Sequence, residues 1–112
     1  MTLSIIKLFP PQALSTGATT IFTCPGPSTT VLKNGRVRLT NFDSSAHAVS
    51  LYTVPSGGAV SSTYACMSSQ SLAAGSYTDL DIPTMAVGDV LKALADAGAV
   101  VNIQELGGVL FS

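Results

Sequence analysis

The chain has 112 residues, of which 46% are apolar and only 10% are charged, with a formal net charge of −1 at pH 7. A chain of this length is expected to form one domain, and its near-neutral charge argues against a nucleic-acid partner, whose phosphates require a basic face. Charged residues make up roughly 25% of a typical soluble domain, so Ser, Thr, Ala and Gly replace much of the usual charge. This composition suits surfaces that pack against other protein; the alternative is a solitary β-domain kept in solution by its hydroxyl groups.

The first nine residues are mostly apolar, but Lys7 interrupts them and Pro10 and Pro11 follow. This run is far shorter than the roughly 18 apolar residues of a membrane span, and no charged segment or cleavage site marks a signal peptide. We therefore expect no membrane partner. In a chain that is not secreted, Cys24 and Cys66 are expected to remain unpaired, buried thiols.

Residues 1–18 are predicted to form an N-terminal arm or edge strand, and residues 19–112 a single β-sandwich domain. The two prolines can continue neither a helix nor a central strand. The large apolar side chains before them need burial, either on a neighbouring subunit or in the first strand of the chain's own core. We expect the first, which makes the arm a candidate interface formed by Ile5, Ile6, Leu8 and Phe9.

The rest of the chain is a series of short strand patterns separated by turn residues. The predicted strands cover residues 19–24, 31–41, 48–54, 59–67, 77–82 and 99–106, and a last apolar stretch follows at 109–111. The strand at 31–41 is typical: Arg36 and Arg38 point one way while Val37 and Leu39 point the other, the pattern of a half-buried strand. Gly107 and the glycine after it are expected to form a turn that ends the strand at 99–106.

Residues 87–96 fit two structures. Val87, Val90, Leu91 and Leu94 have helical spacing, and Asp89 suits a helix N-terminus. The same residues also fit a turn at Gly88-Asp89 followed by a strand. Propensity alone favours the helix slightly.

About seven or eight short strands at regular intervals predict an all-β fold, an antiparallel β-sandwich of jelly-roll type. Its edge strands carry few charges that would block pairing, so oligomerisation is expected to cover them. The predicted core consists of the inward-facing residues Ile21, Val37, Leu39, Val49, Leu51, Leu80, Ile82, Val101 and Ile103.

Reactive side chains are few and scattered. His47, the only histidine, is expected to be a solvated turn residue, and no nucleophile motif accompanies it. Asp79 and Asp81 share a strand face but lack the glycine and distal glutamate of a calcium loop. Arg36 and Arg38 are a solvated strand face or a candidate interface patch. The sequence therefore predicts no enzyme, cofactor, metal site or small-molecule substrate.

The order of motifs resembles a group of small β-sandwich virion proteins of tailed bacteriophages, which decorate capsids or form tail and collar parts. The resemblance covers residues 19–109, and its motifs are IFTCPG, VRLTN, VPSGG, AAG and VGDV, followed by an Ala-rich strand pair ending at Gly107-Gly108. In that group the Gly-Asp position opens a strand, which implies a strand for residues 90–95. The apolar tail after Gly108 departs from the pattern.

The resemblance implies a non-enzymatic capsid decoration (cement) protein that stabilises the phage head. Its partners would be the major capsid protein and further copies of itself, as a dimer or trimer, on the outer capsid surface after assembly in the host cytoplasm. The alternatives are a tail, collar or head–tail component and, more remotely, a carbohydrate-binding module, which the absence of Trp disfavours.

Overall fold

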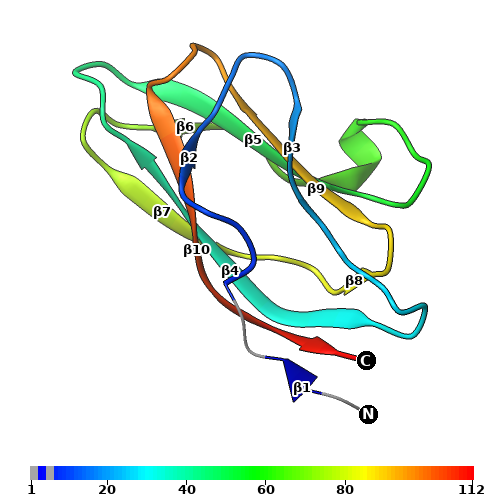
Figure 1. The fold of residues 1–112 in the computed structure, drawn as a ribbon. Coiled ribbons are helices and arrows are strands. Elements are labelled where there is room, and N and C mark those ends of the chain that lie inside the picture. Colours follow the sequence, from blue (N-terminus) through cyan, green and yellow to red (C-terminus); the bar gives the residue numbers. More distant parts are fainter. Residues whose placement is uncertain (1–2, 5–6) are drawn as a thin grey trace.

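Two antiparallel β-sheets pack face to face in the computed structural model, which describes residues 3–4 and 7–112 (Figure 1). The strands are β1 (Leu3–Ser4), β2 (Gln12–Ala13), β3 (Thr19–Thr23), β4 (Val31–Asn41), β5 (His47–Val54), β6 (Ala65–Leu72), β7 (Tyr77–Asp81), β8 (Met85–Ala86), β9 (Val90–Ala95) and β10 (Val101–Phe111). One 3-10 turn, η1 (Ser62–Tyr64), precedes β6. The predicted all-β sandwich is confirmed.

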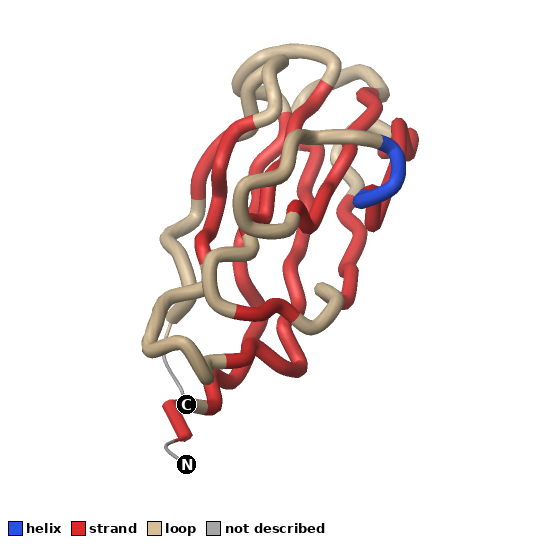
Figure 2. The backbone as a smooth tube through the Cα atoms, turned by 90° about the vertical axis from the view of Figure 1, so that its right-hand side faces the viewer, coloured by secondary structure: helices blue, strands red, loops and turns tan. Residues whose placement is uncertain are grey.

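The sheet that we call the first sheet has the order β1-β10-β4-β7, with β2 also paired to β10 and β8 to β4. The second sheet has the order β3-β9-β5-β6. Figure 2 shows the two layers from the side. The long strands β4 and β10 form the central ladder of the first sheet, so residues far apart in the sequence lie side by side.

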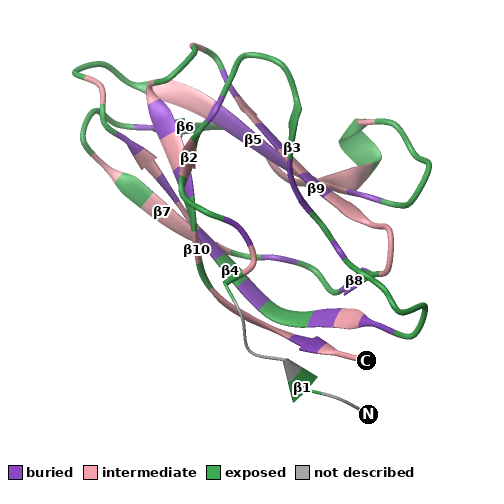
Figure 3. Cartoon of the chain, in the orientation of Figure 1, coloured by how far each residue is buried: buried purple, intermediate pink, exposed green. Residues whose placement is uncertain are grey.

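The core lies between the sheets because each strand alternates apolar and polar residues. All of the predicted core residues are buried except Leu80, which is partly buried against the core (Figure 3). Strand β9 completes the layer with Leu91, Ala93 and Ala95, which are buried while their neighbours are half-buried.

The helix that propensity favours slightly for residues 87–96 is wrong, and the strand implied by the resemblance is correct. Gly88 has a φ of 86°, and the carboxylate of Asp89 accepts the backbone N–H of Ala86 at 2.9 Å, so these residues close a turn. Strand β9 then pairs with β3 on one side and β5 on the other. Backbone pairing on both sides outweighs a weak helical preference.

Two other predicted strand boundaries are wrong. Residues 59–67 are not one strand, because η1 occupies 62–64 and β6 begins at Ala65. Gly107 and Gly108 do not end a strand: β10 runs through them, and its pairing with β4 shifts register on both sides of Gly107. Glycine absorbs such bulges because it tolerates backbone conformations that other residues avoid, and Gly107 has a φ of 154°.

Candidate functional site

The candidate arginines lie on the outer face of the first sheet, where β4 pairs with β7. Arg36 lies opposite Asp81, and the Nε–Oδ1 distance is 2.9 Å. Arg38 forms a two-point contact with Asp79 at 2.7 and 3.0 Å, and its guanidinium lies 4.3 Å from the ring centre of Tyr77. The hydrogen bond from Arg38 lowers the pKa of Asp79.

This charge ladder is neutral overall, since each guanidinium has its own carboxylate. Exposed ion pairs of this kind contribute little to stability, and paired arginines are poorly suited to capture phosphate. The Arg38–Asp79 contact holds the guanidinium against the Tyr77 ring, so these three side chains keep one arrangement on an exposed sheet face. Aromatic and arginine side chains held in this way are typical of protein interfaces.

The described part of the N-terminal arm packs on its own subunit. Phe9 is buried, and its ring centre lies 6.4 Å from that of Phe22. Leu8 fits against Gly108, where a Cβ atom would come within 2.9 Å of the Leu8 side chain. Beyond the two prolines, Leu14 is buried and its N–H donates to the carbonyl of Val101 at 2.8 Å. This stretch therefore returns into the sandwich and does not run clear of it.

Among the residues proposed for the arm interface, Phe9 is thus covered by this chain's own core and Leu8 is half-buried there. Ile5 and Ile6 lie outside the described residues, so their contribution to an interface stays a prediction. The division into an arm at 1–18 and a sandwich at 19–112 likewise stays a prediction.

The outer face of the first sheet also carries an apolar row. The strand registers align Leu3 with Phe111, Phe111 with Val31, and Val31 with Ala86. The neighbouring residues Leu32 and Leu110 are buried in the core. Because successive side chains of a strand point to opposite faces, the row of four faces away from the core.

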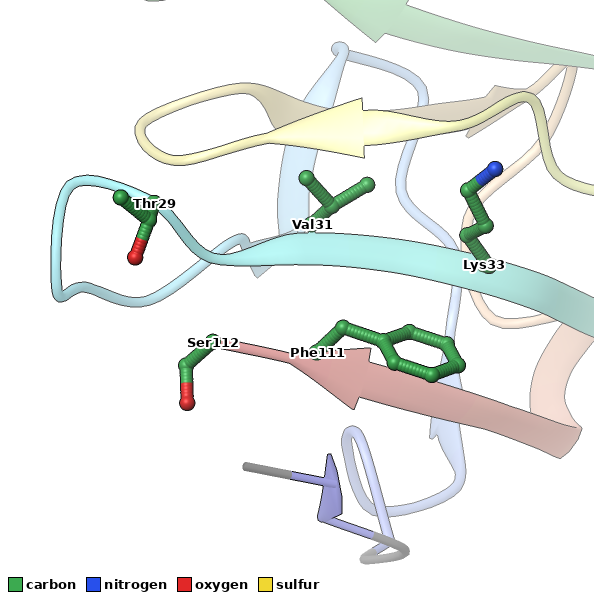
Figure 4. A pocket seen from close by; sticks show the side chains of 5 residues that line it. All are labelled: Thr29, Val31, Lys33, Phe111 and Ser112. Atoms are coloured by element: carbon green, nitrogen blue, oxygen red, sulfur yellow. The ribbon is translucent and has the colours of Figure 1, made fainter. Parts of the chain in front are cut away.

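A hollow of about 490 Å³ lies on this row, where β4 begins and β10 ends (Figure 4). Its lining residues are Thr29, Val31, Lys33, Phe111 and Ser112. Val31 and Phe111 make its wall mainly apolar, and Lys33 adds one cation at its side. Sequence reasoning missed this feature because the row is assembled from four strands; the apolar tail at 109–111 was its only signal.

His47 is not a solvated turn residue, as predicted, but the first residue of β5, with a side chain only 13% exposed. Its Nε2 lies 2.7 Å from an Asp43 carboxylate oxygen, and its Nδ1 lies 2.7 Å from an Asp96 oxygen. The hydrogen bonds to Asp43 and Asp96 raise the pKa of His47. The contact with His47 lowers the pKa of Asp43, and the backbone N–H of Ala48 together with His47 lowers the pKa of Asp96.

Asn41 holds the adjacent loops together at the same end of the sandwich. Its side chain is fully buried, and its Nδ2 donates to the carbonyls of Ser45 at 2.9 Å, Leu72 at 3.0 Å and Ala73 at 3.3 Å. Its Oδ1 accepts the backbone N–H of Asp43 at 3.0 Å. Buried polar groups need such partners, so this network fixes the loop that carries the exposed residue Phe42.

Both cysteine thiols are free. Cys24 is buried, which raises the pKa of its thiol, whereas Cys66 is only half-buried and lies 3.5 Å from the Thr53 hydroxyl. Within residues 3–4 and 7–112, no group of three His, Cys, Asp or Glu side chains is arranged so that it could hold a metal ion. No helix in the described part of the chain is long and apolar enough to cross a membrane.

The fold has counterparts among solved structures. A subunit of the disulfide-linked pili that form Bacillus endospore appendages matches with a TM-score of 0.54 and 15% identity, covering 97% of this chain and 86% of the subunit. Chains of infectious bursal disease virus match at TM-scores of 0.51 (Gx strain, 13% identity) and 0.53 (T13 particle, 11% identity). Each match covers 97% of this chain but only 32% and 30% of the viral chains.

At these identities the comparisons establish a shared fold. This chain spans about a third of the viral chains but most of the appendage subunit. No protein-family model matches the sequence, and no curated protein matches it.

Proposed function

We propose that the protein is a non-enzymatic structural subunit of a virion: a decoration (cement) protein on the head of a tailed bacteriophage. It binds the major capsid protein and further copies of itself on the outer capsid surface, after assembly in the host cytoplasm. The observation that supports this proposal is the fold, a β-sandwich that nearly the whole of this chain shares with chains of a virus particle and a pilus.

The surface supports a role in assembly. It has little charge, and its exposed face carries an apolar row beside a neutral ladder of two ion pairs. Covering the apolar row is favourable, and pairing offsets part of the cost of removing the four charged side chains from water.

A subunit of a fibrous appendage is the second candidate. It is favoured by one specific observation, the match that covers 86% of the appendage subunit, so that subunit and chain correspond almost as wholes. A tail, collar or head–tail component is a third possibility within the same structural class.

Copy number separates these candidates. Quantitative mass spectrometry of purified particles from the source culture is expected to find hundreds of copies per virion for a cement protein. A few to a few dozen copies would instead indicate a tail or collar part. Detection only in a sheared appendage fraction, with none in particles, would replace the virion proposal with the fibre subunit.

A carbohydrate-binding module, the remote alternative, is tested by a glycan array. Reproducible binding of one sugar class there, abolished by surface substitutions on one sheet, would overturn the structural proposal. The expected result is no binding.

A further inference from the structure

The end of the sandwich where β4 finishes presents two exposed aromatic side chains. Phe42, the first residue after β4, is 54% exposed, and Tyr77, at the start of β7, is 59% exposed. Phe42 is rigidly placed, because its N–H donates to the carbonyl of Val100 at 3.0 Å and the buried Asn41 side chain holds the loop beside it. An aromatic ring presented on a fixed backbone loses little entropy when a partner covers it.

The end where β4 begins presents the apolar hollow. Thr29 and Val31 line it from the start of β4, and Phe111 lines it from the end of β10. Its volume of about 490 Å³ is within the range of pockets that enclose a bound group, and it is large enough for one phenyl ring.

The ring and the hollow are too far apart to meet within one subunit. The 11-residue strand β4 connects them, and at about 3.3 Å per residue its length is roughly 35 Å. The molecule is 46 Å long, and β4 runs between its two ends (Figure 1). The aromatic end of one copy can therefore reach only the hollow of another.

The side chains immediately beside the ring and beside the hollow carry opposite charges. Asp43 and Asp96 flank Phe42's end and share the single His47 between them, so this cluster is negative overall. Lys33 lines the hollow and takes part in none of the ion pairs formed by residues 3–4 and 7–112. Opposite charges at two surfaces steer them together and fix their orientation.

We propose that copies of this chain associate head to tail, with the Phe42 ring of one copy inserted into the Thr29–Val31–Phe111 hollow of the next. This inference rests on the self-association in the proposed function and names its surfaces. The contact is heterologous, because two different patches meet, so it leaves one free ring and one free hollow after every addition. Such contacts build rings or open filaments, not closed two-fold dimers.

Two single substitutions at exposed positions test the contact from its two sides. Phe42→Ser removes the ring, and Thr29→Glu places a carboxylate in the hollow, where the incoming ring would strip it of water. Leu106→Ser and Thr63→Glu make the same kinds of change at exposed positions outside the Phe42 loop and outside the lining of the hollow, and serve as matched controls. Thermal melting verifies that all four variants fold.

Sedimentation velocity of the full chain, from about 1 μM to about 1 mM, measures the association. The wild type and both controls are expected to form a series of growing oligomers. Phe42→Ser and Thr29→Glu are each expected to weaken association by a factor of about 30 or more, the level of an interface hot spot.

Mixing the two disrupted variants gives the decisive result. One intact junction remains, between the ring of the Thr29→Glu chain and the hollow of the Phe42→Ser chain. An equimolar mixture is therefore expected to form a dimer that grows no further, at concentrations where each variant alone stays monomeric.

Three results would overturn the inference. If the wild type associates and both variants associate equally well, other surfaces carry self-association and the proposed function stands. If the mixture stays monomeric, ring and hollow do not meet. If the wild type itself stays monomeric up to about 1 mM, self-association fails, and with it both this inference and that part of the proposed function.

Discussion

Replacing Asn41 by Ala is expected to remove much stability, because this buried amide ties together the loop after β4 and the turn after β6. The variant loses the donor to the carbonyls of Ser45, Leu72 and Ala73 and the acceptor for the Asp43 N–H. Each hydrogen bond contributes about 1 kcal/mol net, and a buried carbonyl left without a partner costs about 1–3 kcal/mol. The loops relax in part and admit water, so we expect a total loss of about 3 kcal/mol.

Urea unfolding followed by circular dichroism measures this loss directly. Unfolding entropy of about 2.1 cal/mol/K per residue, applied to 112 residues, converts about 3 kcal/mol into a fall in melting temperature of about 13 °C. Asn41→Asp is expected to be worse than Asn41→Ala, because a carboxylate keeps the acceptor but places negative charge against three carbonyl oxygens.

Asn102→Ala is the matched control. Asn102 lies on the adjacent strand β10, and its Oδ1 is buried without a hydrogen-bond partner. Its removal is expected to change stability by less than about 0.5 kcal/mol, in either direction. Equal losses in Asn41→Ala and Asn102→Ala would refute the reasoning, since the four contacts of Asn41 would then contribute nothing of their own.

Three further predictions follow from single contacts. The pKa of His47 is raised by Asp43 and Asp96, so protonated His47 stabilises the fold below its unfolded pKa of about 6.5, and this contribution is lost as pH rises through the folded pKa. The urea midpoint of the wild type should therefore fall as pH is raised from about 6 to about 9. The midpoint of His47→Gln should not show this fall. Leu39→Ala, at a fully buried site, should cost about 2–5 kcal/mol in urea unfolding, against less than about 0.5 kcal/mol for exposed Leu106→Ala. Gly108→Val should displace the neighbouring Leu8 side chain and so speed tryptic cleavage after Lys7. Gly17→Val should leave the cleavage rate unchanged, because a Cβ atom at Gly17 has no neighbour within 4 Å.

The strands were predictable where the two faces of the sheet differ chemically. In β4, Val37 and Leu39 alternate with Arg36 and Arg38, and the structure buries the first pair while the second pair forms cross-strand ion pairs. A shift by one residue would exchange the faces, so the pattern specifies the orientation of the strand. In residues 59–67 serines blur this difference, and there the prediction of one continuous strand was wrong.

The contacts between distant segments were not predictable. Asp43 lies four residues before His47, but Asp96 reaches it only because β5 pairs with β9. The burial of the arm depends in the same way on Gly108, which leaves space for Leu8 at a position where the sequence suggested only a turn. Local patterns carry no information about which strands become neighbours, and these sites exist only once the neighbours are fixed.

The edges of the sheets bear on how copies of this chain meet. The sequence suggested open edges that oligomerisation would cover, but the structure protects them individually. Strand β7 carries Asp79 and Asp81, and β6 bulges at Ser69, where φ is 46°. Strands β1 and β2 pair with the two ends of β10. Strand β3 has a register shift between Thr20 and Phe22. Charges, bulges and covering strands are the devices that prevent edge-to-edge pairing. The ends of the sandwich expose a fixed ring and an apolar hollow. Copies that associate through these ends use none of the sheet edges, so the protection of the edges does not hinder such association.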